Sequence, residues 1–202
     1  MRNIILASGS PRRAMLMRQM GLHCTVCPSE VKEHVTHTDP ALVVEELSRQ
    51  KCEDVASRTD GVDIVVGADT VVAYAGKILG KPADDKEAAK MIRMLSGAVH
   101  QVFTGVTLMW KKQGVWQSKT FHEQTDVEFF PMSEEEILEY IYPSKGKEQK
   151  TPEWADKAGG YGIQTDFGTK YIRGIRGDYY NVVGLPASRL YQELKAIDAN
   201  EK

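Results

Sequence analysis

The chain has 202 residues, of which 42% are hydrophobic and 27% charged, and its formal net charge is −2. This length and composition are typical of one globular domain, so we expect a single domain over residues 1–202. The near-neutral charge and the lack of a long basic run argue against a nucleic-acid-binding groove. No apolar run is long enough to cross a bilayer, and the first one stops at Ser8, so we expect a cytoplasmic protein without a membrane partner.

The first predicted elements are a short strand over residues 4–7 and a helix over residues 11–20. Ser10 is a suitable N-cap for this helix, and Pro11 suits its first position. Gly21 supplies the stop signal that commonly follows a helix. The sequence therefore predicts a strand, a tight polar loop and a helix in immediate succession.

The start of this helix is a candidate anion site. Its polar side chains are Ser8, Ser10, Arg12 and Arg13. Backbone N–H groups and the helix dipole favour an anion at a helix N-terminus, and the planar arginine fork matches phosphate oxygens. An ordinary capped surface helix with two solvated arginines explains these residues equally well, and the hexapeptide alone leaves both interpretations open.

The three cysteines do not indicate a metal or redox site. Cys24 and Cys27 form a CxxC pair, but no second pair completes a zinc site. The pair also lies in a predicted short strand, away from a helix N-terminus that would activate a thiol. We therefore expect these residues and Cys52 to be reduced and structural.

Residues 62–67 form a nearly continuous β-branched run, which predicts a buried central strand. Asp69 and Thr70 follow at the end of this strand, ahead of a turn at residues 75–76. A carboxylate beyond the end of a buried strand lies where α/β sheets place their sites. The alternative is an aspartate that caps a local backbone N–H in a turn.

Further helices are expected from Asp39 and Pro40, over residues 85–96, over residues 134–142 and from residue 185. Further strands are expected as a hairpin of residues 100–110 and 115–130, and over residues 161–163 and 170–175 with turns at Gly174 and Gly177. The expected loops are one that presents Lys81 and a surface loop over residues 143–154. Strands and helices alternate early and an antiparallel hairpin follows. This order predicts an α/β fold with a mixed β-sheet flanked by helices on both faces.

Five stretches, taken together and in order, resemble the signatures of the Maf family of nucleoside triphosphate pyrophosphatases. They are Leu6–Arg13, Val66–Val72, Gly80–Pro82, Asp156–Gln164 and Gly177–Pro186. The resemblance runs nearly from one end of the chain to the other. It implies a twisted mixed sheet in two lobes around a cleft, an architecture similar to that of the inosine triphosphatase-like proteins of the Maf/Ham1 type.

The resemblance also implies roles for individual residues. It points to Asp69 as the proton acceptor and to Arg12, Thr70 and Gln164 as determinants of substrate choice. It carries over Glu33 as a metal ligand, although the family often has two adjacent acids there and residue 32 is a lysine in this chain. Lys51 would, without the resemblance, be an ordinary solvated helix lysine.

The candidate site combines cations with two carboxylates. The cations are Arg12, Arg13, Lys51 and Lys81, and the carboxylates are Glu33 and Asp69. A unit charge pair gains only about 1 kcal/mol in water at contact distance but ~4 kcal/mol in a partly screened cleft, so converging cations could hold a triphosphate. The carboxylates suit a divalent cation, Mg²⁺ or Mn²⁺, that bridges phosphate oxygens.

The predicted reaction is attack of water on the α-phosphorus, which releases pyrophosphate and a nucleoside monophosphate. The amide of Gln164 offers a donor and an acceptor that complement a uracil or thymine edge, unless it only satisfies local backbone. The Ile163-Gln164 ending resembles the dTTP and UTP branch of the family, rather than the branch for 7-methyl-GTP. The alternatives are a non-catalytic nucleotide sensor that regulates septum formation and, third, a γ-phosphatase. A homodimer is also possible.

Overall fold

The computed structural model describes residues 3–143 and 152–199. The strands are β1 (Ile4–Leu6), β2 (Cys24–Val26), β3 (Ile64–Tyr74), β4 (Lys77–Leu79), β5 (Val99–Lys112), β6 (Val115–Phe129) and β7 (Ile172–Arg176). The helices are α1 (Pro11–Gln19), α2 (Pro40–Ser57), α3 (Asp85–Leu95), α4 (Glu134–Ile141), the 3₁₀ turn η1 (Ala158–Gly160), α5 (Asp166–Tyr171), α6 (Tyr179–Val183) and α7 (Ala187–Ala199).

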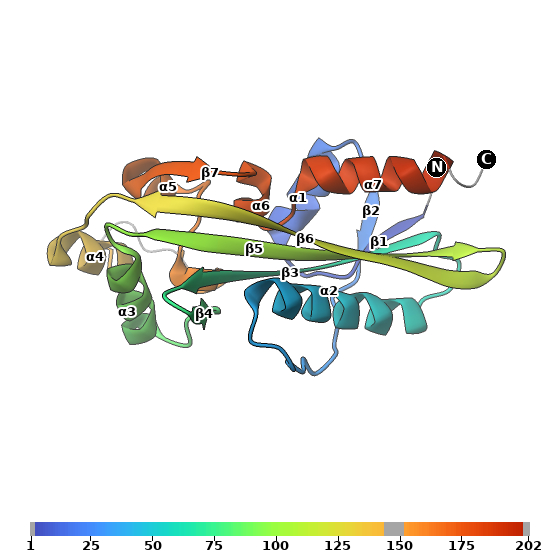
Figure 1. Ribbon diagram of the computed structural model, residues 1–202, viewed down its shortest axis with the longest axis horizontal. Helices are drawn as coiled ribbons and strands as arrows, with labels where there is room; N and C mark the ends of the chain where they lie inside the picture. The colour runs from blue at the N-terminus through green and yellow to red at the C-terminus, as the bar shows by residue number, and fades with distance from the viewer. Residues whose placement is uncertain (1–2, 144–151, 200–202) are drawn as a thin grey trace.

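Within the described residues, all seven strands belong to one sheet in the order β2-β1-β3-β5-β6-β7, with β4 paired to β3. β1 pairs in parallel with β2 and β3, and the remaining pairs are antiparallel. Figure 1 shows the long strands β3, β5 and β6 running along the molecule, with α2 on one side and α7 on the other. The expected mixed sheet flanked by helices is therefore confirmed.

Side chains along β3 alternate between the two faces of the sheet, as the strand period of two requires. Ile64 and Val66 pack in a core with the inner sides of α1 and α7. Val65 packs in a separate core with Cys52 and Val55 of α2. This alternation decides which helix each later residue of β3 faces.

Two glycines let α2 lie directly on the sheet. A Cβ on Gly67 of β3 would come within 2.4 Å of the Ser48 carbonyl oxygen, and a Cβ on Gly105 of β5 within 2.2 Å of the Val44 carbonyl oxygen. Only glycine permits this approach of backbone to backbone. The glycines therefore fix α2, and the residues it carries, at a short distance from β3.

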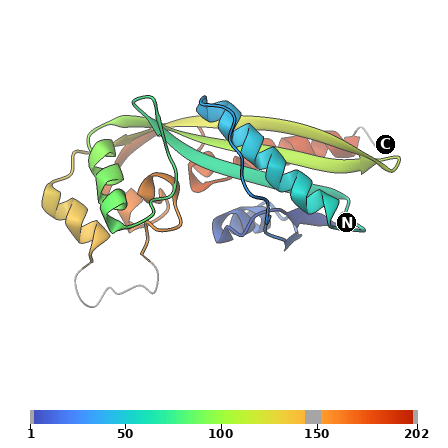
Figure 2. The same ribbon diagram turned by 90° about the horizontal axis from the view of Figure 1, so that it is seen from below.

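The far end of the long strands forms a second lobe. Its core joins α3, α4, η1 and α5 to the ends of β3, β5 and β6. Figure 2 shows α3 and α4 gathered at the end of the molecule opposite the termini, while α2 crosses the middle. The second of the two lobes expected from the family resemblance thus has its own hydrophobic core, separate from the cores that α1, α7 and α2 form on the faces of the first lobe.

Most predicted elements are confirmed, including the hairpin of β5 and β6 and the capping box between Ser133 and Glu136. The hairpin turn consists of Gln113 and Gly114, which both have positive φ, as a tight two-residue turn requires. The helix predicted from Pro40 is α2, whose N-cap Asp39 accepts hydrogen bonds from two backbone N–H groups.

Several predictions are wrong. Asp69 does not follow a strand end, because β3 continues through it to Tyr74. Residues 161–163 form a loop after η1 instead of a strand, since Gly159 and Gly160 both take positive φ and turn the chain there. Gly174 lies inside β7 instead of in a turn.

Four short elements, β4, η1, α5 and α6, had no predicted counterpart. α5 and α6 have six and five residues, too few for a helical period to show in the sequence. Of the predicted surface loop over 143–154, residues 144–151 lie outside the described residues.

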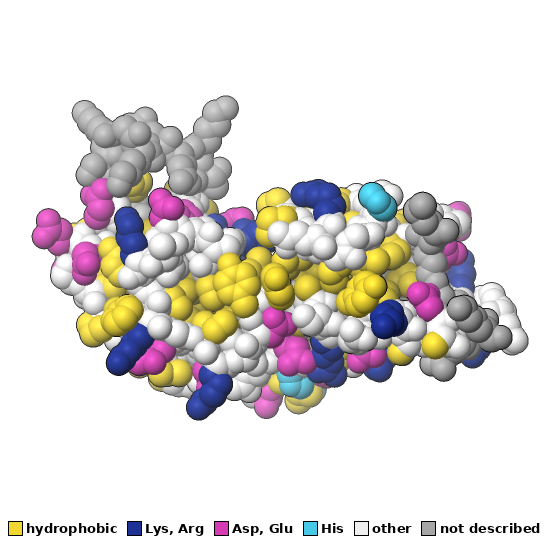
Figure 3. Space-filling view, turned by 90° about the horizontal axis from the view of Figure 1, so that it is seen from above, with side chains coloured by type: hydrophobic (Ala, Val, Ile, Leu, Met, Phe, Trp, Pro, Cys, Tyr) yellow, Lys and Arg dark blue, Asp and Glu magenta, His cyan; other side chains and the backbone are white. Residues whose placement is uncertain are grey.

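Figure 3 shows hydrophobic side chains gathered across the middle of the face seen from above, the side on which α6 and α7 lie in Figure 1. The exposed aromatic side chains of α6 and α7 include Tyr179, Tyr180 and Tyr191, each 41% exposed. Among the described residues, no helix combines the length and apolar character needed to cross a bilayer.

Candidate functional site

A cleft of about 450 Å³ lies between the two lobes. Its lining includes all the residues expected to bind substrate, which are Ser8, Ser10, Arg12, Arg13, Lys51, Thr70, Lys81 and Gln164, together with Asp69. We call residues 8–13 with Lys51, Asp69 and Thr70 the sheet wall. Lys81 and residues 156–164 form the loop wall. The sequence-predicted residues thus converge on one place, although they come from segments far apart in the chain.

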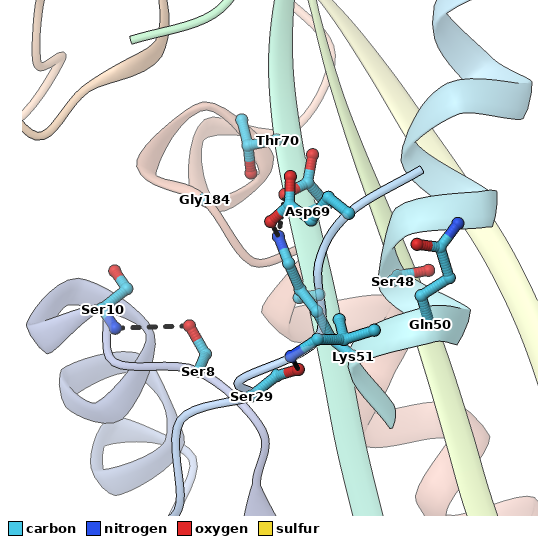
Figure 4. A network of polar contacts seen from close by, with 12 residues as sticks. Ser8, Ser10, Ser29, Ser48, Gln50, Lys51, Asp69, Thr70 and Gly184 are labelled. Atoms are coloured by element: carbon cyan, nitrogen blue, oxygen red, sulfur yellow. Dashed lines mark hydrogen bonds and ion pairs between the residues drawn. The ribbon is translucent and has the colours of Figure 1, made fainter. Parts of the chain in front are cut away.

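Asp69 and Thr70 face opposite sides of β3 because they are neighbours on a strand. Asp69 lies on the α2 side, where it forms an ion pair with Nζ of Lys51. Thr70 lies on the other side and accepts a hydrogen bond from Arg13 at 3.1 Å. Figure 4 shows Lys51 pointing to Asp69 while Thr70 points toward Gly184. Although Asp69 lies within β3, β1 ends at Leu6, opposite Val66, so Asp69 still lies beyond the parallel part of the sheet.

Lys51 also forms an ion pair with Glu33, whose carboxylate lies 2.9 Å from Nζ. Glu33 is about half exposed and does not line the cleft itself, so it meets the site at its rim. Its loop is fixed by Gln50 of α2, which bonds both to the backbone N–H of His34 at 3.0 Å and to the His34 carbonyl at 2.6 Å. Gln50 and Lys51, which are neighbours on α2, thus hold two neighbouring loop residues, His34 and Glu33.

Arg13 connects several segments of the chain at the cleft through its guanidinium. Its guanidinium donates to the hydroxyls of Ser8 and Thr70 and to the carbonyls of Ala68 and Gly184, at 2.8 to 3.1 Å. Burial lowers the pKa of Arg13, and the nearby charge of Asp69 opposes that shift. Four donated hydrogen bonds tie the loop after β1 to β3 and to the end of α6. Sequence reasoning found Arg13 but not this bracing geometry.

Arg12 reaches across the cleft to a residue that the sequence reasoning did not select. Its Nη1 lies 2.5 Å from Oδ2 of Asp156, and its Nη2 donates to the Asp156 backbone carbonyl at 3.1 Å. Nζ of Lys157 donates to Oδ1 of Asp156 at 2.7 Å. Burial opposes ionisation of Asp156, but the hydrogen bonds from Lys157 and Arg12 outweigh it and lower the pKa of the carboxyl. Lys157 lines the cleft too and adds a cation.

Three hydrogen bonds anchor the loop wall to the second lobe. The N–H of Gly159 donates to the carbonyl of Gly80 at 3.0 Å. The carbonyl of Gly160 accepts from Tyr140 at 2.8 Å, and the hydroxyl of Tyr161 lies 2.7 Å from Nε2 of His100. Gln164 stands at the exposed end of this anchored segment.

The start of α1 contributes the expected helix N-terminus to the sheet wall. Ser10 occupies the N-cap position, but its side chain makes no capping hydrogen bond. The backbone N–H of Ser10 donates to the hydroxyl of Ser8 at 3.3 Å. The first turn of α1 carries no acidic residue, so the positive end of the helix dipole is not offset there.

A divalent cation would have two carboxylates available. Among the described residues, no group of three or more His, Cys, Asp or Glu side chains is placed to hold a metal. Glu33 and Asp69 nevertheless converge on a single cation, the ammonium of Lys51. Mg²⁺ in proteins is usually held by one or two carboxylates together with waters and substrate phosphates. The donor set therefore fits a cation that arrives with a phosphate ligand.

The fold and the site define an α/β protein with a cation-lined cleft between two lobes, suited to a phosphate-rich ligand. The family model described as "Maf-like protein" matches residues 3–197, and the chain belongs to this family.

Similar proteins from three bacteria are each named "dTTP/UTP pyrophosphatase". The protein of Agathobacter rectalis is 48% identical over 98% of both chains. That of Bacillus cytotoxicus is 46% identical over 98% of this chain and 97% of its own. That of Lachnoclostridium phytofermentans is 44% identical over 96% of this chain and 95% of its own. A solved HAM1 protein from Coxiella burnetii aligns with 64% of this chain and 73% of its own at 16% identity, with a TM-score of 0.43.

Proposed function

We propose that this protein is a nucleoside triphosphate pyrophosphatase that hydrolyses dTTP and UTP to the monophosphate and pyrophosphate. The observation that carries the proposal is the convergence of Arg12, Lys51 and Lys81 with Asp69 on one cleft. The name shared by relatives similar over nearly the whole chain supports the same reaction and the pyrimidine substrates. Such an enzyme would remove excess or non-standard pyrimidine triphosphates from nucleotide pools.

The charges of the cleft suit a triphosphate. Its lining carries five cations, which are Arg12, Arg13, Lys51, Lys81 and Lys157, and two anions, which are Asp69 and Asp156. The formal net charge of this lining is therefore 5 − 2 = +3. A triphosphate carries several negative charges, and a partly screened cleft makes each close contact worth more than it is in water. Arginine and helix N–H donors suit its terminal oxygens.

In the proposed mechanism, water attacks the α-phosphorus, the bond from this phosphorus to the bridging oxygen breaks, and pyrophosphate leaves. Asp69 takes the proton of the attacking water. Its carboxylate has two acceptor oxygens, so one can stay with Lys51 while the other meets the water. Lys51 and Lys81 hold the phosphates, and Arg12, Thr70 and Gln164 select the substrate. Glu33 and Asp69 would hold a bound Mg²⁺ or Mn²⁺, which supplies charge neutralisation at the phosphates.

The test is a panel of nucleoside triphosphates assayed for pyrophosphate and for orthophosphate, with Mg²⁺, with Mn²⁺ and with excess chelator. We expect pyrophosphate to appear, dTTP and UTP to give the highest kcat/KM, and chelator to abolish turnover until metal is restored. A purine triphosphate as best substrate would contradict the role of Gln164. Full turnover in excess chelator would contradict the metal role of the carboxylates.

The same panel separates the other candidate functions. Nucleotide binding without turnover would favour the regulator of septum formation, and release of orthophosphate would favour a γ-phosphatase. The homodimer and the cytoplasmic location stay predictions. Light scattering of the purified protein tests the first, and cell fractionation tests the second.

A further inference from the structure

The carboxylate of Asp156 lies in a cleft that we propose binds a polyanion, and this position needs an explanation. Asp156 lines the cleft, and its charge would repel a triphosphate. Two cations border it, with Arg12 on Oδ2 and Lys157 on Oδ1. Unlike Asp69, it lies on the loop wall, away from the ion pair that joins Lys51 to the carboxylates of the sheet wall. Its contacts therefore favour a role that acts through its cationic neighbours.

The contact between Arg12 and Asp156 crosses the cleft. Arg12 belongs to the first turn of α1 on the sheet wall, whereas Asp156 is 144 positions further along the chain, on the loop wall. The guanidinium is gripped twice, by the carboxylate and by the backbone carbonyl of the same residue. An arginine has five N–H donors in a rigid fork, so this grip leaves three donors for a substrate.

Asp156 and Gln164 belong to one anchored segment. Between them, Gly159, Gly160 and Tyr161 are each hydrogen-bonded to the second lobe. Tyr161 is 5% exposed, and its ring packs edge-on against Phe129. The side chain that would read the base and the carboxylate that holds Arg12 are thus parts of the same short, supported stretch.

We propose that Asp156 is a positioning residue for substrate choice, which holds Arg12 in register with the segment that carries Gln164. This inference rests on the proposed function and deepens it. Arg12 and Gln164 can select a nucleotide together only if the distance between them is defined. The bidentate grip of Asp156 defines it, since the grip joins the loop wall to the first turn of α1. Loss of Asp156 leaves the proton acceptor in place but lets Arg12 hold the triphosphate at positions where the base no longer meets Gln164.

The experiment compares Asp156→Ala and Asp156→Asn with the wild type on dTTP and dGTP. We expect the ratio of kcat/KM for dTTP over that for dGTP to fall roughly tenfold or more in Asp156→Ala, since lost matched polar contacts relax discrimination. Asp156→Asn keeps the shape and an acceptor oxygen, so its ratio should lie between those of the wild type and Asp156→Ala. The kcat for dTTP should stay within about threefold of the wild type in both variants, because Asp69 and Lys51 are untouched.

The control is Asp126→Ala. Asp126 forms an ion pair with Arg176 between β6 and β7, and it does not line the cleft. We expect this variant to keep the wild-type ratio of kcat/KM for dTTP over dGTP. That result would show that loss of an aspartate–arginine pair away from the cleft does not relax discrimination. An unchanged ratio in both Asp156 variants, or an equal fall for both nucleotides, would overturn the inference.

Equilibrium binding separates this inference from the proposed function. Calorimetry with α,β-imido analogues of dTTP and dGTP measures selection without turnover. We expect the ratio of the two dissociation constants to move toward one in Asp156→Ala, and an unchanged ratio would again overturn the role of Asp156. A wild type that binds these analogues selectively but releases no pyrophosphate would contradict the proposed function alone.

Discussion

On the sheet wall, Asp69 belongs to a central strand and Lys51 to a long helix packed directly on that strand, whereas on the loop wall Gln164 follows a single 3₁₀ turn. The sheet wall is fixed by the pairing of Asp69 and Thr70 with β5, by the pairing of β3 with β1 just before them, and by glycines that bring α2 close. The loop wall is held to the second lobe by three hydrogen bonds and by ring contacts of Tyr161, and to Arg12 by the side chain and carbonyl of Asp156. Bond breaking needs atoms at defined positions, and the more rigid wall carries the proposed chemistry. Recognition of the base is assigned to the more lightly anchored wall.

Asp69→Asn should have the largest effect, because it removes a proposed proton acceptor from the rigid wall and keeps its shape. We expect kcat to fall by roughly two to four orders of magnitude, the usual range for loss of a general base. Affinity for the triphosphate should change much less, since the cations remain. Steady-state kinetics beside calorimetry measures both, with Asp60→Asn on the exposed surface as the control. A folded Asp69→Asn protein with near wild-type kcat would remove Asp69 from the mechanism.

The free energy of unfolding should depend on pH through His100, whose ring contacts Tyr161 of the loop wall. Burial lowers the pKa of His100 to about 4, below the ordinary 6.5 that it regains on unfolding. Between these values the unfolded chain binds a proton that the folded chain does not, so stability falls as the pH falls from about 6.5 to 4. The loss is on the order of 3 kcal/mol.

Denaturant unfolding at pH 7 and at pH 4 measures this loss. The His100→Gln variant should show a smaller drop in the free energy of unfolding than the wild type, because it has no group to titrate there. Since carboxylates also respond in this range, the difference between the two proteins is the quantity to compare. Equal drops would mean that His100 is not held neutral against Tyr161.

Gly67→Ala should damage the sheet wall through packing alone. The new Cβ would lie 2.4 Å from the Ser48 carbonyl, so α2 must shift away from β3 and take Lys51 with it. We expect a loss of roughly 1–3 kcal/mol in the free energy of unfolding, as is typical of overpacking. Gly174→Ala is the matched control, because nothing lies within 4 Å of its added Cβ and its φ is not positive. Similar unfolding midpoints for the two variants would contradict close packing of α2.

Lys81→Ala should have the smallest effect and should act on binding. Lys81 is exposed at the cleft edge, where a charge contact is worth on the order of 1 kcal/mol. We expect KM for dTTP to rise about five- to tenfold, with a smaller rise at high salt because the contact is screened. Lys90→Ala, on α3 and outside the cleft lining, should leave KM unchanged. A fall in kcat without a rise in KM would assign Lys81 to the chemistry instead.

The sheet wall was largely predictable from local sequence. A β-branched run marks β3, and Ser10 and Pro11 mark the start of α1. Once β3 is placed, its period of two puts Asp69 and Thr70 on opposite faces. The predicted end of the strand at Gly67 was wrong, because β3 continues to Tyr74 and Gly67 lies inside it, where the lack of a Cβ admits α2.

The cross-cleft contacts were not predictable in the same way. Arg12 and Asp156 are 144 positions apart, and nothing local to either residue indicates the other. The bracing role of Arg13 depends on carbonyls of Ala68 and Gly184, which no side-chain pattern reveals. The sequence signals for the loop wall were the resemblances of Gly80–Pro82 and residues 156–164 to the family motifs, which located these segments without their contacts.

The most direct measurement for the central claim is hydrolysis of dTTP in water enriched in oxygen-18, with the products analysed by mass spectrometry. Attack of water on the α-phosphorus predicts one labelled oxygen in the monophosphate and none in the pyrophosphate. Label in pyrophosphate would place the attack on the β-phosphorus, and labelled orthophosphate would place it on the γ-phosphorus. Either result would contradict the assignment of Asp69 as the residue that delivers water to the α-phosphorus.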